Sequence, residues 1–423
     1  MSHQSPFQRF AALILLASTH ALPAMAADWP RFRGPTGMGT SDTKGLPVSW
    51  TKTDNIVWKT PLPGAGASSP IVFGNRIFLT CYTGHLVPGE SGGGVDRLKR
   101  HLLAISRADG RILWNQAVPA RLPEEDRIRD HGYAASTPAA DADRVYVFFG
   151  KTGVFAFAHE GKQLWQADVG SKTSGWGSAA SPLLHKDLVI INASVESDSL
   201  VALDRRTGRE VWRAAGIKEA WNTPVIVPAA SGRLELVIAT AGRILAFDPD
   251  SGSPLWSCRT DIGWYMVPSV VADKGIVFSI GGRSGIAALA VRTGGSGDVT
   301  ASHRLWTSQN GANVSSPVYL DGHLYYMHQD GMACCIKAQT GELVYRERLN
   351  RAGQVYASTL LADGRIYCVS RSGMVYVLAA GPRFEQLAAN DLSDRGSFDA
   401  TPAVDGNRLL IRSDKFLYCI GGK

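Results

Sequence analysis

Aromatic side chains recur in six of seven short segments that each lead into a motif such as Ser-Thr-Pro or Asn-Thr-Pro. Aromatic faces beside a few polar groups are typical of sites that bind small molecules, glycans or peptides. The aromatic residues of these segments are Tyr133, Trp176, Trp221, Trp264, Tyr265, Tyr356 and Phe398. The polar residues beside them are Asp130, His131, Asn222, Asn313, Gln354 and Arg395. Together they are the candidate binding residues of the chain.

Two interpretations of these segments remain open. In the first, the side chains ring a concave mouth and bind a ligand or a partner. In the second, they fill a central channel or wedge between neighbouring structural units. Taken alone, His131 is more typical of a surface or hydrogen-bonded histidine than of a ligand-binding one.

Six cysteines are the residues of this chain most suited to redox chemistry, and Cys334 and Cys335 are adjacent. Cysteines of an exported protein can pair, but the sequence does not determine the connectivity. Aligning GMACCIKAQTG with KFLYCIGG places Cys335 and Cys419 at the same position of a strand. Free cysteine suits such a position because it is small and apolar. We therefore expect a structural role for the adjacent pair.

The acidic residues do not form a pattern that would hold a metal ion. Asp330, Asp363 and Asp405 each precede a glycine in a turn-like segment, where aspartate usually accepts hydrogen bonds from backbone amides. The sequence therefore predicts neither a metal site nor a catalytic residue.

The elements that must position these residues form a repeat with a period of roughly 40 to 50 residues, which is typical of propellers and solenoids. Eight units open with a motif such as SSPIVFG, NTPVIVP or ATPAVDG, and each continues with two further β-rich runs. The segment VALDRRTGREVW, residues 201–212, shows how a third strand connects to a fourth. Asp204 and Gly208 suit the tight turn between them.

A large aromatic residue ends most of the fourth strands, and we expect it to dock neighbouring units together. These residues are Trp58, Trp114, Trp165, Trp212, Trp256, Trp306 and Tyr345. Trp58 precedes the first opening motif, whereas the last unit stops after Phe416–Ile420 without a fourth strand. We therefore predict an all-β, eight-bladed propeller of four-stranded antiparallel blades, closed by an N-terminal strand that completes the last blade.

The repeated phrase ALD..TG..VW, with its docking tryptophans, resembles the pyrroloquinoline-quinone (PQQ)-like β-propeller repeat of the quinoprotein alcohol dehydrogenase-like superfamily. The resemblance covers about residues 54 to 422, and DWPRFRGPTGMG resembles the leader of exported bacterial members. The dehydrogenases of this superfamily bind PQQ with calcium and carry a vicinal disulfide against the cofactor. This chain lacks the acidic cluster, the long insertions and the Cys-x-x-Cys-His haem motif of that class, so we expect no cofactor and keep PQQ binding as the alternative.

The N-terminus has the pattern of a secretory signal. Arg9 precedes an apolar run over residues 10–17, and a small-residue motif ends at Ala26. The run is too short for a membrane anchor, which needs about 18 apolar residues. We expect residues 1–26 to be a signal peptide, 27–53 a leader segment and 54–423 one propeller. The mature chain is expected to be periplasmic or secreted, without a transmembrane segment.

The formal net charge of +7 arises from Lys and Arg residues scattered through the turns of every repeat. This distribution favours a solvated basic surface over a nucleic-acid partner. The resulting hypothesis is an exported, non-catalytic propeller that acts as a binding or assembly scaffold in the cell envelope, similar to the propeller component of outer-membrane barrel assembly. Its partner would be a protein, or a small-molecule or glycan ligand, at one mouth. The alternative is a PQQ-binding oxidoreductase.

Overall fold

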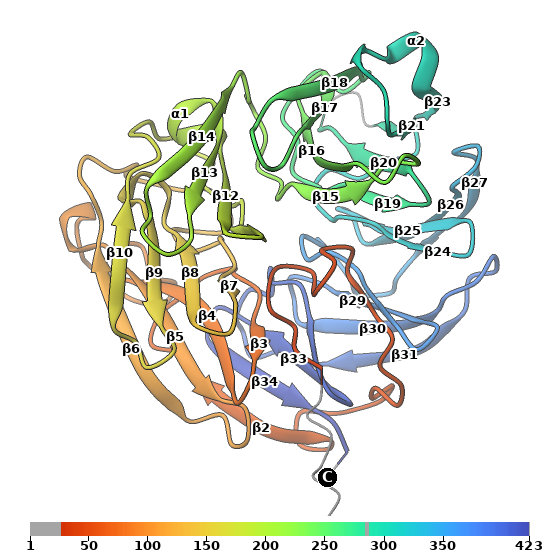
Figure 1. Cartoon of the computed structure of the whole chain (residues 1–423). Coiled ribbons are helices and arrows are strands. Elements are labelled where there is room, and N and C mark those ends of the chain that lie inside the picture. Colours follow the sequence, from red (N-terminus) through yellow and green to blue (C-terminus); the bar gives the residue numbers. More distant parts are fainter. Residues whose placement is uncertain (1–26, 284–286, 423) are drawn as a thin grey trace, which may run out of the picture.

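Eight antiparallel β-sheets radiate from a central axis in the computed structural model of this chain, which describes residues 27–283 and 287–422 (Figure 1). Each sheet forms one blade with four strands in sequence order, except the last, which takes its outer strand from the start of the chain. The predicted all-β, eight-bladed propeller is therefore confirmed. The predicted signal peptide, residues 1–26, lies outside the described residues.

The strands of each blade are given in order from the channel to the outer edge of the ring. Blade 1 contains β3 (Ile71–Phe73), β4 (Arg76–Thr83), β5 (Lys99–Ser106) and β6 (Ile112–Pro119). Blade 2 contains β7 (Ala139–Ala140), β8 (Arg144–Phe148), β9 (Val154–Ala158) and β10 (Gln163–Ala167). Blade 3 contains β11 (Leu183–His185), β12 (Leu188–Ala193), β13 (Ser199–Asp204) and β14 (Glu210–Ala215). Blade 4 contains β15 (Val225–Pro228), β16 (Leu234–Thr240), β17 (Arg243–Phe247) and β18 (Pro254–Arg259), with β22 (Gly297–Asp298) added at its edge.

The second half of the ring follows the same plan. Blade 5 contains β19 (Val271–Asp273), β20 (Ile276–Gly281), β21 (Ala287–Arg292) and β23 (Arg304–Ser308). Blade 6 contains β24 (Val318–Leu320), β25 (His323–His328), β26 (Met332–Lys337) and β27 (Leu343–Arg348). Blade 7 contains β28 (Leu360–Ala362), β29 (Arg365–Val369), β30 (Met374–Ala379) and β31 (Gln386–Asp391), with β1 (Thr40–Ser41) beside β28. Blade 8 contains β32 (Ala403–Asp405), β33 (Arg408–Arg412), β34 (Phe416–Ile420) and β2 (Ile56–Pro61).

Helices are short and lie in the connections. They are η1 (Val95–Arg97), η2 (Gly150–Thr152), α1 (Ser194–Ser197) and α2 (Thr300–His303). Over residues 27–283 and 287–422, none of them has the length and apolar character needed to cross a bilayer.

The ring is closed by strands from the two ends of the described chain. Strand β2 lies beside β34 in Figure 1 and pairs with it antiparallel. In this pairing Trp58 lies opposite Cys419. This pairing satisfies backbone groups that an open array would leave exposed at an edge. The predicted closure is confirmed.

A closed ring of hydrogen bonds around the channel explains why a Ser or Thr recurs in every opening motif. In each blade the backbone N–H of this residue donates to the hydroxyl oxygen of the equivalent residue in the next blade, at 2.9–3.1 Å. The residues are, in order, Ser69, Thr137, Ser181, Thr223, Ser269, Ser316, Ser358 and Thr401, and Thr401 donates back to Ser69. Since a buried N–H without a partner is costly, these hydroxyls hold adjacent blades in register.

Tryptophans at the outer strands pack against the glycine of the third-to-fourth-strand turn in the next blade. A Cβ placed on that glycine would lie only 2.5–3.0 Å from the indole ring. The pairs are Trp58 with Gly110, Trp114 with Gly161, Trp165 with Gly208, Trp212 with Gly252 and Trp306 with Gly341. The repeated glycine therefore makes the turn and also leaves room for the neighbouring indole ring.

Two of the seven candidate docking residues make a different contact. The Trp256 indole N–H donates to a buried carboxylate, Glu235, at 2.7 Å, because the next blade replaces the glycine turn by a longer connection. The Tyr345 ring packs edge-on against Phe384, with 5.7 Å between the ring centroids.

The leader segment packs against the propeller and closes one end of the channel. Trp29 exchanges backbone hydrogen bonds with Val72, and the Pro30 carbonyl accepts one from Ala140. Phe32 lines the channel, and the fully buried Arg33 guanidinium donates to the Pro317 carbonyl across it. The channel is therefore blocked on the face where the first and second strands of each blade connect.

All six cysteines are free and buried. Cys335 lies opposite Tyr345 as Cys419 lies opposite Trp58, so the two cysteines occupy equivalent third-strand positions as predicted. Burial raises the pKa of Cys335 and of Cys419 to about 12. These thiols are therefore protonated near neutral pH, which fits a packing role.

Candidate binding site at the propeller mouth

A cavity of about 1060 Å³ opens at the end of the channel opposite the leader segment. We call this cavity the mouth. Below it lies a narrower space of about 130 Å³, here called the throat, which Phe32 closes from the other side. His131, Trp221 and Tyr356 are among the residues that line both spaces. The channel is therefore a pocket with one open end.

Most of the predicted site residues meet at the mouth. It is lined by Trp176, Trp221, Tyr265, Asn313 and Tyr356, with Asp130, His131 and Gln354. Trp264 is 38% exposed, and its ring packs edge-on against Tyr265, which lines the mouth. Asn222 lines the throat.

Trp264 and three further candidates line neither the mouth nor the throat. Tyr133 is buried between blades, where its hydroxyl donates to the Glu125 carbonyl and its ring packs edge-on against Tyr82. Phe398 is fully buried against Gly373 and Tyr418. Arg395 is exposed and does not line the cavity. The two aromatic side chains are thus buried against neighbouring residues and lie away from the mouth.

The mouth also contains residues that no repeated sequence pattern indicates. Arg127 and Arg129 come from the long connection between β6 and β7, whereas Arg283 and Gln329 lie between the second and third strands of their blades. For Arg127 and Arg129, the unusual length of the segment RLPEEDRIRDHG was the feature of the sequence that could have indicated them. Turns between second and third strands emerge on the same face of the ring as the aromatic segments that lead into each blade. This rule could have indicated Arg283 and Gln329.

The aromatic side chains of blades 3, 4 and 5 form one cluster. Trp176 stacks on Tyr265 with 5.7 Å between the centroids and 21° between the planes, and Trp221 meets the Tyr265 ring edge-on at 5.5 Å. The Trp221 indole N–H donates to the Gly177 carbonyl at 2.7 Å. These contacts hold the rings in place and leave part of their faces toward the cavity.

An ion-pair network forms the opposite wall. The Arg371 guanidinium donates to the Asp399 carboxylate at 2.7 and 3.3 Å, lies 3.6 Å from Asp130, and packs over the Tyr356 ring at 4.3 Å. Burial raises the pKa of Asp399 to about 6, while the Arg371 charge opposes that shift. The two carboxylates on this side are thus paired with one arginine.

His131 positions the wall of the mouth. Its ring nitrogens lie 3.0 Å from the Gly132 carbonyl oxygen and 2.8 Å from the Trp176 carbonyl oxygen. Burial lowers the pKa of His131, which favours the neutral imidazole. The side chain therefore connects the long β6–β7 connection to the link that carries Trp176.

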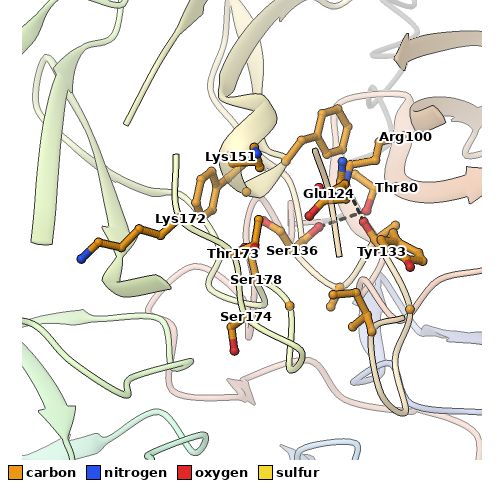
Figure 2. Close-up of a pocket in the computed structure, with 18 residues that line it drawn as sticks. Thr80, Arg100, Glu124, Tyr133, Ser136, Lys151, Lys172, Thr173, Ser174 and Ser178 are labelled. Atoms are coloured by element: carbon orange, nitrogen blue, oxygen red, sulfur yellow. Dashed lines mark hydrogen bonds and ion pairs between the residues drawn. The ribbon is translucent and has the colours of Figure 1, made fainter. Parts of the chain in front are cut away.

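A buried polar cluster anchors that connection from behind (Figure 2). The Arg100 guanidinium donates to the Glu124 carboxylate at 2.6 Å, and the two side chains are only 6% and 4% exposed. Arg100 also donates to the Tyr133 carbonyl at 2.9 Å, and the Lys151 ammonium donates to the Pro123 carbonyl. The adjoining space of about 20 Å³ has room for a water molecule only. This cluster is therefore structural.

Glu196, beside the same cluster, makes the stability of the protein depend on pH. Burial raises its pKa to about 7 from the ordinary 4.5, and the Ser178 hydroxyl donates to its carboxyl group. Between these two values the folded chain holds a proton that the unfolded chain has lost. The stability from this group is therefore present below pH 4.5 and is lost as the pH rises through about 7.

We expect Glu196→Gln to remove this dependence. Relative to the variant, the wild type should lose about 3 kcal/mol of unfolding free energy between acidic and slightly alkaline pH, since one pKa unit corresponds to about 1.4 kcal/mol. Chemical denaturation at a series of pH values measures the difference. A constant difference across this range would contradict a protonated, buried Glu196.

The eight blades and the family match below define a β-propeller of PQQ-like repeats. The chain matches the family model described as "Outer membrane protein assembly factor BamB" over residues 93–296 and 296–382, and it belongs to this family. Among curated proteins, it is 23% identical over 273 residues to the outer membrane protein assembly factor BamB of Yersinia pestis, covering 61% of this chain and 65% of that protein. It is 25% identical over 233 residues to the tetrathionate hydrolase of Acidithiobacillus ferrooxidans, covering 49% of this chain and 43% of that protein. The chain thus spans less than two thirds of either relative.

Solved structures share the fold at low sequence identity. BamB from Moraxella catarrhalis has a TM-score of 0.59 at 17% identity, over 86% of this chain and 98% of that one. Quinohemoprotein alcohol dehydrogenase from Comamonas testosteroni has a TM-score of 0.65 at 12% identity, over 95% of this chain and 82% of that one. Because both assembly factors and dehydrogenases share this architecture, the fold alone does not decide between them.

The described residues do not fit a quinone site of the calcium-dependent type. Cys334 and Cys335 are buried within blade 6 and line neither the mouth nor the throat. Over residues 27–283 and 287–422, no group of three or more His, Cys, Asp or Glu side chains is arranged to hold a metal ion.

Proposed function

We propose that this protein is an exported, non-catalytic scaffold that supports the assembly of outer-membrane proteins by binding a partner at the mouth. The single observation that carries this proposal is membership of the BamB family across residues 93–382. The mouth supports it, because a wide cavity with aromatic and polar walls is suited to binding. Export rests on the signal-like pattern of residues 1–26.

Complementation tests the proposal. In a Gram-negative host that lacks its own BamB, we expect expression of the full chain to restore the level of folded outer-membrane β-barrels. The folded fraction is measured from the mobility difference between heated and unheated membrane samples on gels. A variant without residues 1–26 is the matched control, since it stays in the cytoplasm and should restore nothing.

Two outcomes would count against the scaffold. One is a full-length chain that accumulates in the periplasm and leaves the folded fraction unchanged. The other is a rise in melting temperature on addition of PQQ with calcium, because a ligand that binds only the folded state stabilises it. That second result would favour the alternative, a PQQ-binding oxidoreductase.

A further inference from the structure

Three arginines in the mouth have no acidic partner. Arg127, Arg129 and Arg283 line the cavity, and over residues 27–283 and 287–422 none of their guanidinium groups forms an ion pair. By contrast, the one acidic residue of the lining, Asp130, lies 3.6 Å from Arg371. The lining therefore carries an excess of positive charge directed at the cavity, which attracts anionic groups.

Aromatic rings orient two of these arginines. The Arg129 guanidinium lies 5.2 Å from the centre of the Trp176 ring, and the Arg283 guanidinium lies 5.6 Å from the centres of both Trp176 and Trp264. A guanidinium that packs on an aromatic face keeps its N–H groups available at its edge. Those donors match the two oxygens of a carboxylate.

The throat is suited to a ligand group other than a carboxylate. Most of the surface that its lining exposes is apolar and includes Phe32, Ala67, Ala179, Val267 and Val314, although the hydrogen-bonded Ser and Thr residues of the ring and Asp399 also line it. Its volume of about 130 Å³ is small compared with the mouth above it. A single apolar side chain can enter this space, and burial of its surface would favour binding.

Two amide oxygens of residues that line these spaces have no hydrogen-bond donor within the described chain. Asn222 donates through Nδ2 to the Ala239 carbonyl at 2.7 Å and to the Met266 carbonyl at 3.3 Å, so its Oδ1 is the free atom. The Oδ1 atoms of Asn222, in the throat, and of Asn313, in the mouth, are both buried without a partner. If the side chains turn toward a ligand, the backbone N–H groups of a peptide can donate to these oxygens, whereas carboxylates cannot at neutral pH.

We propose that the mouth binds an acidic segment of a partner polypeptide, with carboxylates on Arg127, Arg129 and Arg283 and one apolar side chain in the throat. The volume of the mouth, about 1060 Å³, is slightly above the usual range of about 300–1000 Å³ for small-ligand sites. It therefore has room for a short segment of polypeptide. This inference rests on the proposed scaffold function and specifies the chemistry of the partner. It assigns the anionic groups to the partner and the cationic groups to this protein.

A synthetic peptide tests the inference with purified full-length protein. The probe has a central leucine with two glutamates on each side and blocked termini, and isothermal titration measures its affinity. We expect the glutamate peptide to bind at least about tenfold more tightly than the same peptide with glutamines, and its affinity to fall as salt rises. Replacement of the leucine by alanine should weaken binding by about tenfold.

Matched protein variants locate the site. The triple variant R127Q/R129Q/R283Q should weaken binding of the glutamate peptide by at least about tenfold. The control R111Q/R206Q/R383Q removes the same charge from three exposed residues in hairpins and should bind as the wild type does. Equal melting temperatures of the two variants would show that both are folded.

Three results would overturn the inference. They are equal affinity for the glutamate and glutamine peptides, unchanged binding by R127Q/R129Q/R283Q, and tighter binding of benzene-1,3,5-tricarboxylate than of the glutamate peptide. The last result would assign the site to a small organic anion. Complementation separates this failure from failure of the scaffold function: if the triple variant restores folded β-barrels as well as the wild type, the function stands and the acidic segment does not.

Discussion

Gly208→Ala is expected to lower the unfolding free energy by about 3 kcal/mol, from a strained backbone together with overpacking against the neighbouring blade. Gly208 has a φ of +75°, and an added Cβ would lie 2.7 Å from the Trp165 ring of blade 2. The indole cannot retreat easily, because its N–H donates to the Arg205 carbonyl at 3.1 Å. The variant should therefore loosen the contact between blades 2 and 3. Chemical denaturation measures the loss.

Gly242→Ala is the matched control for this prediction. Gly242 has nearly the same φ, +76°, but no atom lies within 4 Å of an added Cβ. Its expected loss is about 1–2 kcal/mol, from backbone strain alone. Equal losses for the two variants would show that the indole contact contributes nothing. Pairing Gly208→Ala with Trp165→Leu should cost less than the sum of the single losses, because the smaller side chain makes room.

Arg100→Met is expected to cost about 3–5 kcal/mol, because it leaves the Glu124 carboxylate buried without its cation. The same side chain donates to the Tyr133 carbonyl at 2.9 Å and to the Thr152 hydroxyl at 3.1 Å. Loss of these bonds should also free the connection that carries Arg127 and Arg129. We therefore expect weaker binding of the glutamate peptide together with the lower unfolding free energy.

The double variant R100M/E124L separates the cost of burying an unpaired charge from the cost of losing the hydrogen bonds of Arg100. It removes both charges of the pair and should recover most of the stability, since apolar replacements of a buried ion pair are often neutral. A double variant no more stable than Arg100→Met would mean that the hydrogen bonds to Tyr133 and Thr152 account for the loss.

The blades and their closure were predictable because they depend on local patterns that repeat. The segment from Val201 to Trp212 contains a strand, a glycine turn and a docking tryptophan, and its register in the structure follows that order. Trp58 could be assigned to the last blade because it carries the same phrase without the strands that should precede it. The recurring Ser or Thr was visible as well, although its role as an acceptor for the next blade required coordinates.

The direction in which the aromatic side chain of each inter-blade segment points was not predictable in the same way. Trp176 and Tyr356 face the mouth, whereas Tyr133 and Phe398, from links that look similar in sequence, pack between blades. The difference depends on local backbone geometry and on distant neighbours such as Tyr82 and Tyr418. A single sequence does not contain these contacts in a form that a repeat pattern can show.

Recurrence along the chain was therefore enough to establish the number of blades, their strand order and the residue that completes the ring, because each of these follows from hydrogen bonding and burial within one repeat. The composition of the mouth depended on segments that do not repeat. Arg127 and Arg129 belong to one long connection, held in place by an arginine on β5, and Phe32 reaches the throat from the leader. Side chains from such unrelated segments meet only through long-range packing, and their excess positive charge becomes visible only once they share one cavity.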